Sequence, residues 1–159
     1  MPPDANNQPI EQEKNMIVQQ FPVVRRQWAN EASNTDQSEG LFVTQSSDGK
    51  TITVVSDAAS VPHGVVSNPD GRDGAEGNGA DLILLTHPGI VQVRLNDTPG
   101  SVEVGTELAL CADGTVKAAG GVAGEVVVAK SMTSNSSGHG GVLIDAILVC
   151  NPVATTASE

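Results

Sequence analysis

The sequence has 159 residues, with 8 Lys plus Arg against 19 Asp plus Glu, so its formal net charge is −11. This length suits one domain of ordinary size with additional terminal segments. Binding to DNA or RNA needs Lys and Arg for the phosphates and aromatic faces for the bases, and only 2% of these residues are aromatic. The composition therefore excludes non-specific nucleic-acid binding. No apolar run approaches the roughly 18 residues of a membrane span, and the N-terminus lacks the basic and apolar regions of a secretory signal.

The first 40 residues differ in composition from the remainder, because they are rich in Asn, Gln, Glu and Pro. Such a composition is typical of a segment that buries little surface on its own, and we predict an extended N-terminal arm over residues 1–40. An apolar island followed by two arginines and a tryptophan interrupts this segment. The residues expected to contact a partner or a neighbouring subunit are Met16, Ile17, Val18, Phe21, Val23, Val24, Arg25, Arg26 and Trp28. A second interpretation stays open, in which Phe21, Val23 and Val24 form a first strand and Trp28 covers the end of the fold.

All three aromatic residues, Phe21, Trp28 and Phe42, lie at the N-terminal end of the chain. Aromatic side chains are enriched in the residues that dominate binding energy at interfaces, so we expect a hot spot for a partner in this region. No aromatic residue follows Phe42, so the core of the remaining chain is built from Val, Leu, Ile and Ala.

Regular strand signals begin at residue 41. Residues 41–44 and 51–55 are β-branched and apolar, and Asp48-Gly49 between them suits a tight turn, which predicts a hairpin. A short strand interrupted at Pro62 is expected over residues 61–66. Residues 68–79 are polar and rich in Gly and Asp, which indicates a surface loop.

Further strands follow at regular intervals. They are expected over residues 81–86, 89–95, 108–110, 124–130 and 141–149, with a hairpin turn at 112–114 and a polar loop at 131–140. Turn signals about every 8 to 12 residues are typical of sandwiches and barrels. We therefore predict an all-β fold, a small β-barrel or β-sandwich with an extended N-terminal arm. Its parts would be the arm at 1–40, the β domain at 41–152 and a C-terminal tail at 153–159.

No pattern in the sequence predicts a catalytic residue, a cofactor or a metal site. Cys111 and Cys150 lie beside apolar residues, so buried free thiols are expected, and a disulfide between them stays open. His63, His87 and His139 lie apart from one another in turns or loops. The acidic loop at 70–81 does not have the spacing of a calcium-binding EF-hand and contains Arg72, so a solvated loop is preferred to a cation site.

The order of the pieces between residues 51 and 150 carries a resemblance to a known family. The pieces are Val61-Pro62-His63-Gly64-Val65-Val66, Gly89-Ile90-Val91-Gln92-Val93, Val102-Glu103-Val104-Gly105-Thr106-Glu107-Leu108, Ala112-Asp113-Gly114-Thr115-Val116 and the two strands beginning at Gly124 and Gly141. This order resembles the capsid cement, or head decoration, proteins of tailed bacteriophages over roughly two-thirds of the chain. Gly105-Thr106-Glu107 departs from the Gly-Asp that usually precedes the Leu-containing strand of that family.

The resemblance implies a non-enzymatic viral structural protein, made in the host cytoplasm, that binds the outer surface of a phage capsid and stabilises it. Its implied partners are the major capsid protein and further copies of itself, as a dimer or trimer. One alternative is an autoprocessing peptidase-like domain of a phage fibre, which needs Cys111 or Cys150 beside His139. The other is a displayed receptor- or glycan-binding module, for which Trp28 is the available aromatic face.

Overall fold

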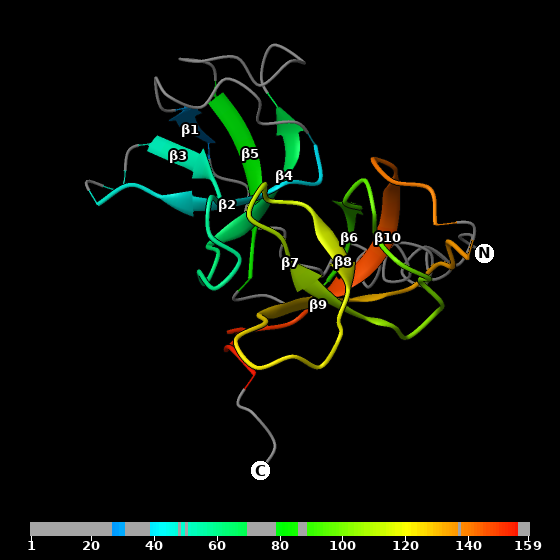
Figure 1. Ribbon diagram of the computed structural model, residues 1–159. Coiled ribbons are helices and arrows are strands. Elements are labelled where there is room, and N and C mark those ends of the chain that lie inside the picture. The colour runs from blue at the N-terminus through cyan, green and yellow to red at the C-terminus, as the bar shows by residue number, and fades with distance from the viewer. Residues whose placement is uncertain are drawn as a thin grey trace, which may run out of the picture.

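The computed structural model describes residues 27–30, 39–47, 49, 51–69, 79–85, 89–136 and 138–155. Within these ranges the protein consists of ten strands and has no helix, which confirms the all-β prediction (Figure 1). The strands are β1 (Gln27–Asn30), β2 (Phe42–Gln45), β3 (Thr51–Val54), β4 (Gly64–Pro69), β5 (Gly79–Leu84), β6 (Ile90–Arg94), β7 (Glu107–Leu110), β8 (Val116–Ala118), β9 (Val127–Ser131) and β10 (Leu143–Leu148).

The first sheet closes into a ring of five strands in the order β1-β3-β2-β4-β5. The predicted hairpin is present as β2 and β3, which pair antiparallel with Thr44 opposite Thr53. Gly49 in its turn has a φ of +71°, a conformation that glycine adopts without strain. β1 pairs parallel with β3 and antiparallel with β5, and so closes the ring.

Strand β4 begins later and ends later than expected. It starts at Gly64 rather than at Val61, because Pro62 has no N–H to donate to a neighbouring strand. Pairing with β5 continues beyond a bulge after Val66 and reaches Pro69, which lies opposite Ala80. The two strands thus extend into both ends of the predicted 68–79 loop, and residues 70–78 lie outside the described residues.

The second sheet has five antiparallel strands in the order β6-β10-β9-β7-β8. Each lies where a strand or hairpin was expected between residues 89 and 149, so these predictions are confirmed. The two outer strands approach each other at one point, since Leu95, directly after β6, forms a bridge with Val116 in β8. The sheet therefore curves strongly towards closure.

The two sheets share one hydrophobic core, and the ring has a second, smaller core of its own. The smaller core contains Val43, Ile52, Val66 and Leu82, all from the first sheet, which places it inside the ring. Phe42 and Val65, the neighbours of Val43 and Val66, belong to the larger core together with residues of β6 to β10. Successive side chains of a strand point to opposite faces, so β2 and β4 are buried on both.

The turn between β7 and β8 packs against the first sheet. Phe42 donates its backbone N–H to the carbonyl oxygen of Gly114 at 2.8 Å. Gly114 has a φ of +75°, and a Cβ atom there would lie 2.6 Å from Val54 Cγ1. The neighbouring Asp113 carboxylate accepts hydrogen bonds from the Thr115 N–H at 3.0 Å and from the Asn96 amide at 3.1 Å. These contacts hold the β7–β8 turn of the second sheet against the first sheet.

Candidate functional site

The predicted partner-binding segment lies almost wholly outside the described residues. This applies to Met16, Ile17, Val18, Phe21, Val23, Val24, Arg25 and Arg26. The last member of the set, Trp28, is placed in β1, where its backbone is the partner of Ala80 in β5. The end of the segment expected to be an arm therefore takes part in the first sheet. That the segment contacts a partner stays a prediction.

Phe42 is not available to a partner in this fold. Its side chain is fully buried in the core shared by the two sheets. The expectation that Phe42 contributes to a surface hot spot is therefore wrong. As the largest apolar side chain in that core, it was needed in the interior, where it contacts both sheets.

The outer face of the second sheet presents exposed apolar side chains in neighbouring strands. Ile90 in β6 is 64% exposed, and Ile147 directly opposite in β10 is 37% exposed. The next strands continue this row with Lys130 opposite Ile147 and Glu107 opposite Lys130. Cross-strand neighbours of opposite charge stabilise each other, so Lys130 and Glu107 form a matched pair at one end of the row.

Charged side chains share this face with the two isoleucines, namely Asp145 of β10 and, opposite Leu143, Arg94 of β6. On β10 the side chains of Leu143, Asp145 and Ile147 alternate with the buried Ile144 and Ala146 and so share the outer face. Asp145 is exposed, and Gln92 lies opposite it in β6. The one ion pair found among the described residues joins Lys117 to Glu125 at 3.9 Å and does not involve Asp145.

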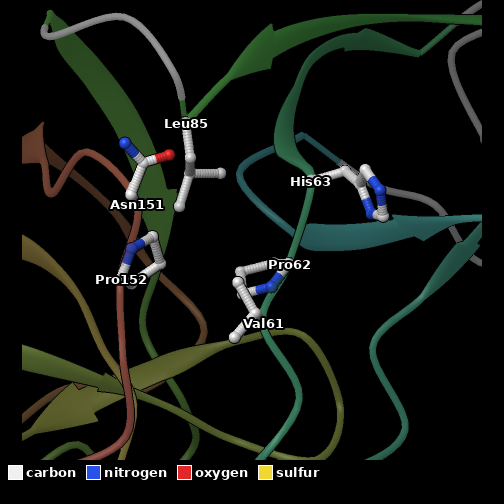
Figure 2. A pocket seen from close by; sticks show the side chains of 6 residues that line it. All are labelled: Val61, Pro62, His63, Leu85, Asn151 and Pro152. Atoms are coloured by element: carbon white, nitrogen blue, oxygen red, sulfur yellow. The ribbon is translucent and has the colours of Figure 1, made fainter.

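A hollow of about 330 Å³ lies between the end of the first sheet and the C-terminal segment (Figure 2). Its lining consists of Val61, Pro62, His63, Leu85, Asn151 and Pro152. Figure 2 shows the imidazole of His63 directed away from Asn151 and Leu85, and its Nδ1 accepts the N–H of Gln45 at 3.3 Å. The hollow can hold a small apolar group, and it presents no nucleophile and base that face each other.

The two cysteines are free, which leaves no disulfide between them. Cys111 is half-buried, whereas Cys150 is exposed, so the expectation of two buried thiols is wrong for Cys150. The reason is that β10 ends at Leu148, and Cys150 lies beyond the alternation of inward and outward side chains. Burial raises the pKa of the Cys111 thiol, and a hydrogen bond with Thr115 opposes this shift. A raised pKa leaves Cys111 protonated at neutral pH and therefore a weak nucleophile.

The Cys–His pair of the peptidase alternative is not assembled in the described part of the chain. His139 precedes β10 and Cys150 follows it, and a strand of this length separates its ends by about 17 Å. The carbonyl oxygen of His139 accepts the amide of Asn135 at 2.7 Å, whereas the thiol of Cys111 has Thr115 and Asp113 beside it. Covalent catalysis needs nucleophile and base within hydrogen-bond reach.

The residues that the structure describes contain no group of three or more His, Cys, Asp or Glu side chains able to hold a metal ion. In the same ranges no helix has the length and apolar character that crossing a membrane requires. The acidic loop considered for a cation falls mostly outside them.

Comparison with known proteins finds a similar fold among solved structures. No protein-family model matches the sequence, and no curated protein matches it either. Among solved structures, the chain is similar to the head fiber gp8.5 N base of bacteriophage phi29, with a TM-score of 0.53 and 15% sequence identity. The likeness covers 85% of this chain and 99% of that one. At this identity it describes a shared fold, and it extends over nearly the whole of the other structure.

Proposed function

We propose that this chain is a non-enzymatic structural protein of a phage virion that attaches to the outer surface of the capsid and stabilises it. The observation that carries the proposal is the fold likeness, which spans 99% of a solved chain described as the N base of a phage head fiber. The strand-and-turn order between residues 51 and 150 supports the same role, because it resembles that of phage head decoration proteins.

The described surface agrees with a binding role rather than a catalytic one. The thiol of Cys111 is held protonated by burial, and the imidazole of His63 is turned away from the hollow that it borders. The net charge of −11 suits a protein packed densely on a particle, since like charges on neighbouring particles oppose aggregation.

The partners in this proposal are the major capsid protein and further copies of this chain, as a dimer or trimer. The nine residues from Met16 to Trp28 singled out above make the contact with the capsid or a neighbouring subunit. Linking several weak contacts through one oligomer raises the overall affinity without any new contact, so a small chain can hold a capsid seam.

The test is attachment of the purified full-length chain to capsids that lack it, measured by co-sedimentation. We expect saturable binding and a higher disruption temperature of the decorated capsids. The double variant Phe21→Ser, Val24→Ser is expected to bind about tenfold more weakly, because it removes two apolar side chains from the predicted contact segment. Val104→Ser, at a site 66% exposed in the second sheet's turn, serves as the matched control. Absence of binding by the unmodified chain refutes the proposal, and full binding by the double variant refutes the role of the segment.

A further inference from the structure

We infer that the outer face of the second sheet binds the same face of a second copy of this chain across a two-fold axis. The inference rests on the proposed function and deepens it, because it names the surface through which two copies associate. Side chains of four neighbouring strands form this face: Ile90 and Arg94 of β6, Asp145 and Ile147 of β10, Lys130 of β9 and Glu107 of β7.

Two isoleucines form the apolar centre of the face. Ile90 is 64% exposed and Ile147 is 37% exposed, and as cross-strand partners their side chains lie about 5 Å apart. Met132, directly after β9, is 39% exposed, and its N–H donates to the carbonyl oxygen of Asp145 at 2.8 Å, which places it beside these strands. Exposed apolar side chains that lie together mark interaction surfaces more often than scattered ones do.

The charged groups around the isoleucines balance one another. They are the two cations Arg94 and Lys130 and the two carboxylates Asp145 and Glu107. The ion pair found among the described residues involves none of these four groups. A face with equal numbers of both signs matches a partner that also carries both signs, and an identical face does so.

The charge of the whole chain makes this face the suitable place for contact between copies. Two chains that each carry a net charge of −11 repel each other in solution. At a face where cations and carboxylates are equal in number, this repulsion is smallest. An apolar centre can then be buried between two copies without bringing an excess of like charges together.

Asp145 and Lys130 have the arrangement that a two-fold contact needs. Lys130 lies opposite Ile147, and Asp145 is two residues from Ile147 on the same side of β10, so Asp145 and Lys130 are diagonal neighbours. A two-fold axis in the plane of contact that exchanges these two positions sets each Asp145 against Lys130 of the other copy. Ile147 lies about 7 Å along the strand from Asp145 and about 5 Å across the strands from Lys130, and is therefore close to this axis. The same axis thus brings the two Ile147 side chains together between two ion pairs, and the contact closes at two copies.

A charge exchange in the full-length chain tests the inference. We expect the unmodified chain to form a dimer at micromolar concentration in analytical ultracentrifugation. Asp145→Lys alone and Lys130→Asp alone each set like charges against each other across the axis, so each is expected to dimerise about tenfold more weakly. The double variant Asp145→Lys, Lys130→Asp is expected to regain the dimer, because both ion pairs are then restored with reversed sign. An equimolar mixture of the two single variants is also expected to regain it, which distinguishes contact between chains from contact within one.

Two matched controls accompany these variants. Asp57→Lys makes the same charge change at an exposed position between β3 and β4 of the first sheet, and its association is expected to match that of the unmodified chain. Ile90→Ser is expected to weaken the dimer, whereas Val122→Ser, at a site 62% exposed between β8 and β9, is expected to leave it unchanged. The unfolding midpoint of every variant is measured, and Asp145→Asn with Lys130→Gln replaces any charge reversal that prevents folding.

The inference specifies one kind of assembly and one surface. A monomeric unmodified chain, a trimer in place of the dimer, or undiminished association of the single variants would each overturn it. So would a double variant and a mixture that both stay dissociated.

These results separate from those of the capsid experiment. A weaker dimer of Asp145→Lys together with weaker capsid attachment supports both proposals, because fewer linked copies bind with lower avidity. If the unmodified chain dimerises as described but does not attach to capsids, the proposed function fails while the inferred contact stands. If it attaches to capsids as a monomer, the inferred contact fails while the proposed function stands.

Discussion

The two sheets bury their side chains in different ways. In the ring, β2 and β4 are enclosed on both faces, because Phe42 and Val65 pack against the second sheet while Val43 and Val66 fill the interior. In the second sheet, buried side chains of β10 alternate with exposed or half-buried ones. Continuous apolar runs thus mark the strands between two cores, and alternation marks the sheet whose outer face is exposed.

The largest effect is expected where the two cores are joined. Phe42→Ala removes the biggest side chain of the shared core, and such truncations cost about 3 to 5 kcal/mol of folding free energy. Val43→Ala, one position away but inside the smaller ring core, is expected to cost about 1 to 3 kcal/mol, since fewer atoms are removed. Denaturant unfolding measures both. Equal losses at the two positions would contradict the distinction between the cores.

The next largest loss of stability is expected where the β7–β8 turn packs against the ring. Gly114→Ala meets a positive φ and also places a Cβ 2.6 Å from Val54 Cγ1 and 2.8 Å from the Phe42 carbonyl oxygen. Gly105→Ala is the matched control, because Gly105 has a φ of +90° with nothing within 4 Å of the added carbon. We expect a loss of about 1 kcal/mol for Gly105→Ala from backbone strain and about 2 to 4 kcal/mol for Gly114→Ala. An equal loss of folding free energy in Gly105→Ala would show that the packing of the β7–β8 turn against the ring contributes nothing.

The same contrast limits what the sequence predicts. The strands of the second sheet were expected from local apolar runs and turn residues, and the run from Gly89 to Leu95 also from its alternation. The closure of the ring was harder to predict, because it depends on β1. This four-residue strand pairs with β3 and β5, which lie far from it in the sequence. No local feature of the sequence Gln27-Trp28-Ala29-Asn30 predicts that pairing. The outer face has the same origin, since Ile90 and Ile147 become neighbours only through the register of β6 and β10.

The thiol of Cys111, at the start of the β7–β8 turn, should make the stability of the fold depend on pH. Its pKa is raised mainly by burial, so the folded chain holds this proton more tightly than the unfolded chain. Its contribution to stability is therefore complete below the ordinary thiol pKa and falls as pH rises from there through the raised value. Unfolding midpoints measured from pH 7 to 10 should decline less steeply in Cys111→Ala. In the unmodified chain at neutral pH, a thiol reagent is expected to modify the exposed Cys150 before Cys111.

The smallest effect on stability is expected on the outer face, where the comparison is made within one strand. Ile144 of β10 is buried, whereas Ile147 is 37% exposed. Ile144→Val should cost about 1 kcal/mol by removing a methylene from the core, and Ile147→Val less than about 0.5 kcal/mol. Denaturant unfolding measures both losses, and equal losses would contradict the alternation of buried and exposed side chains along β10.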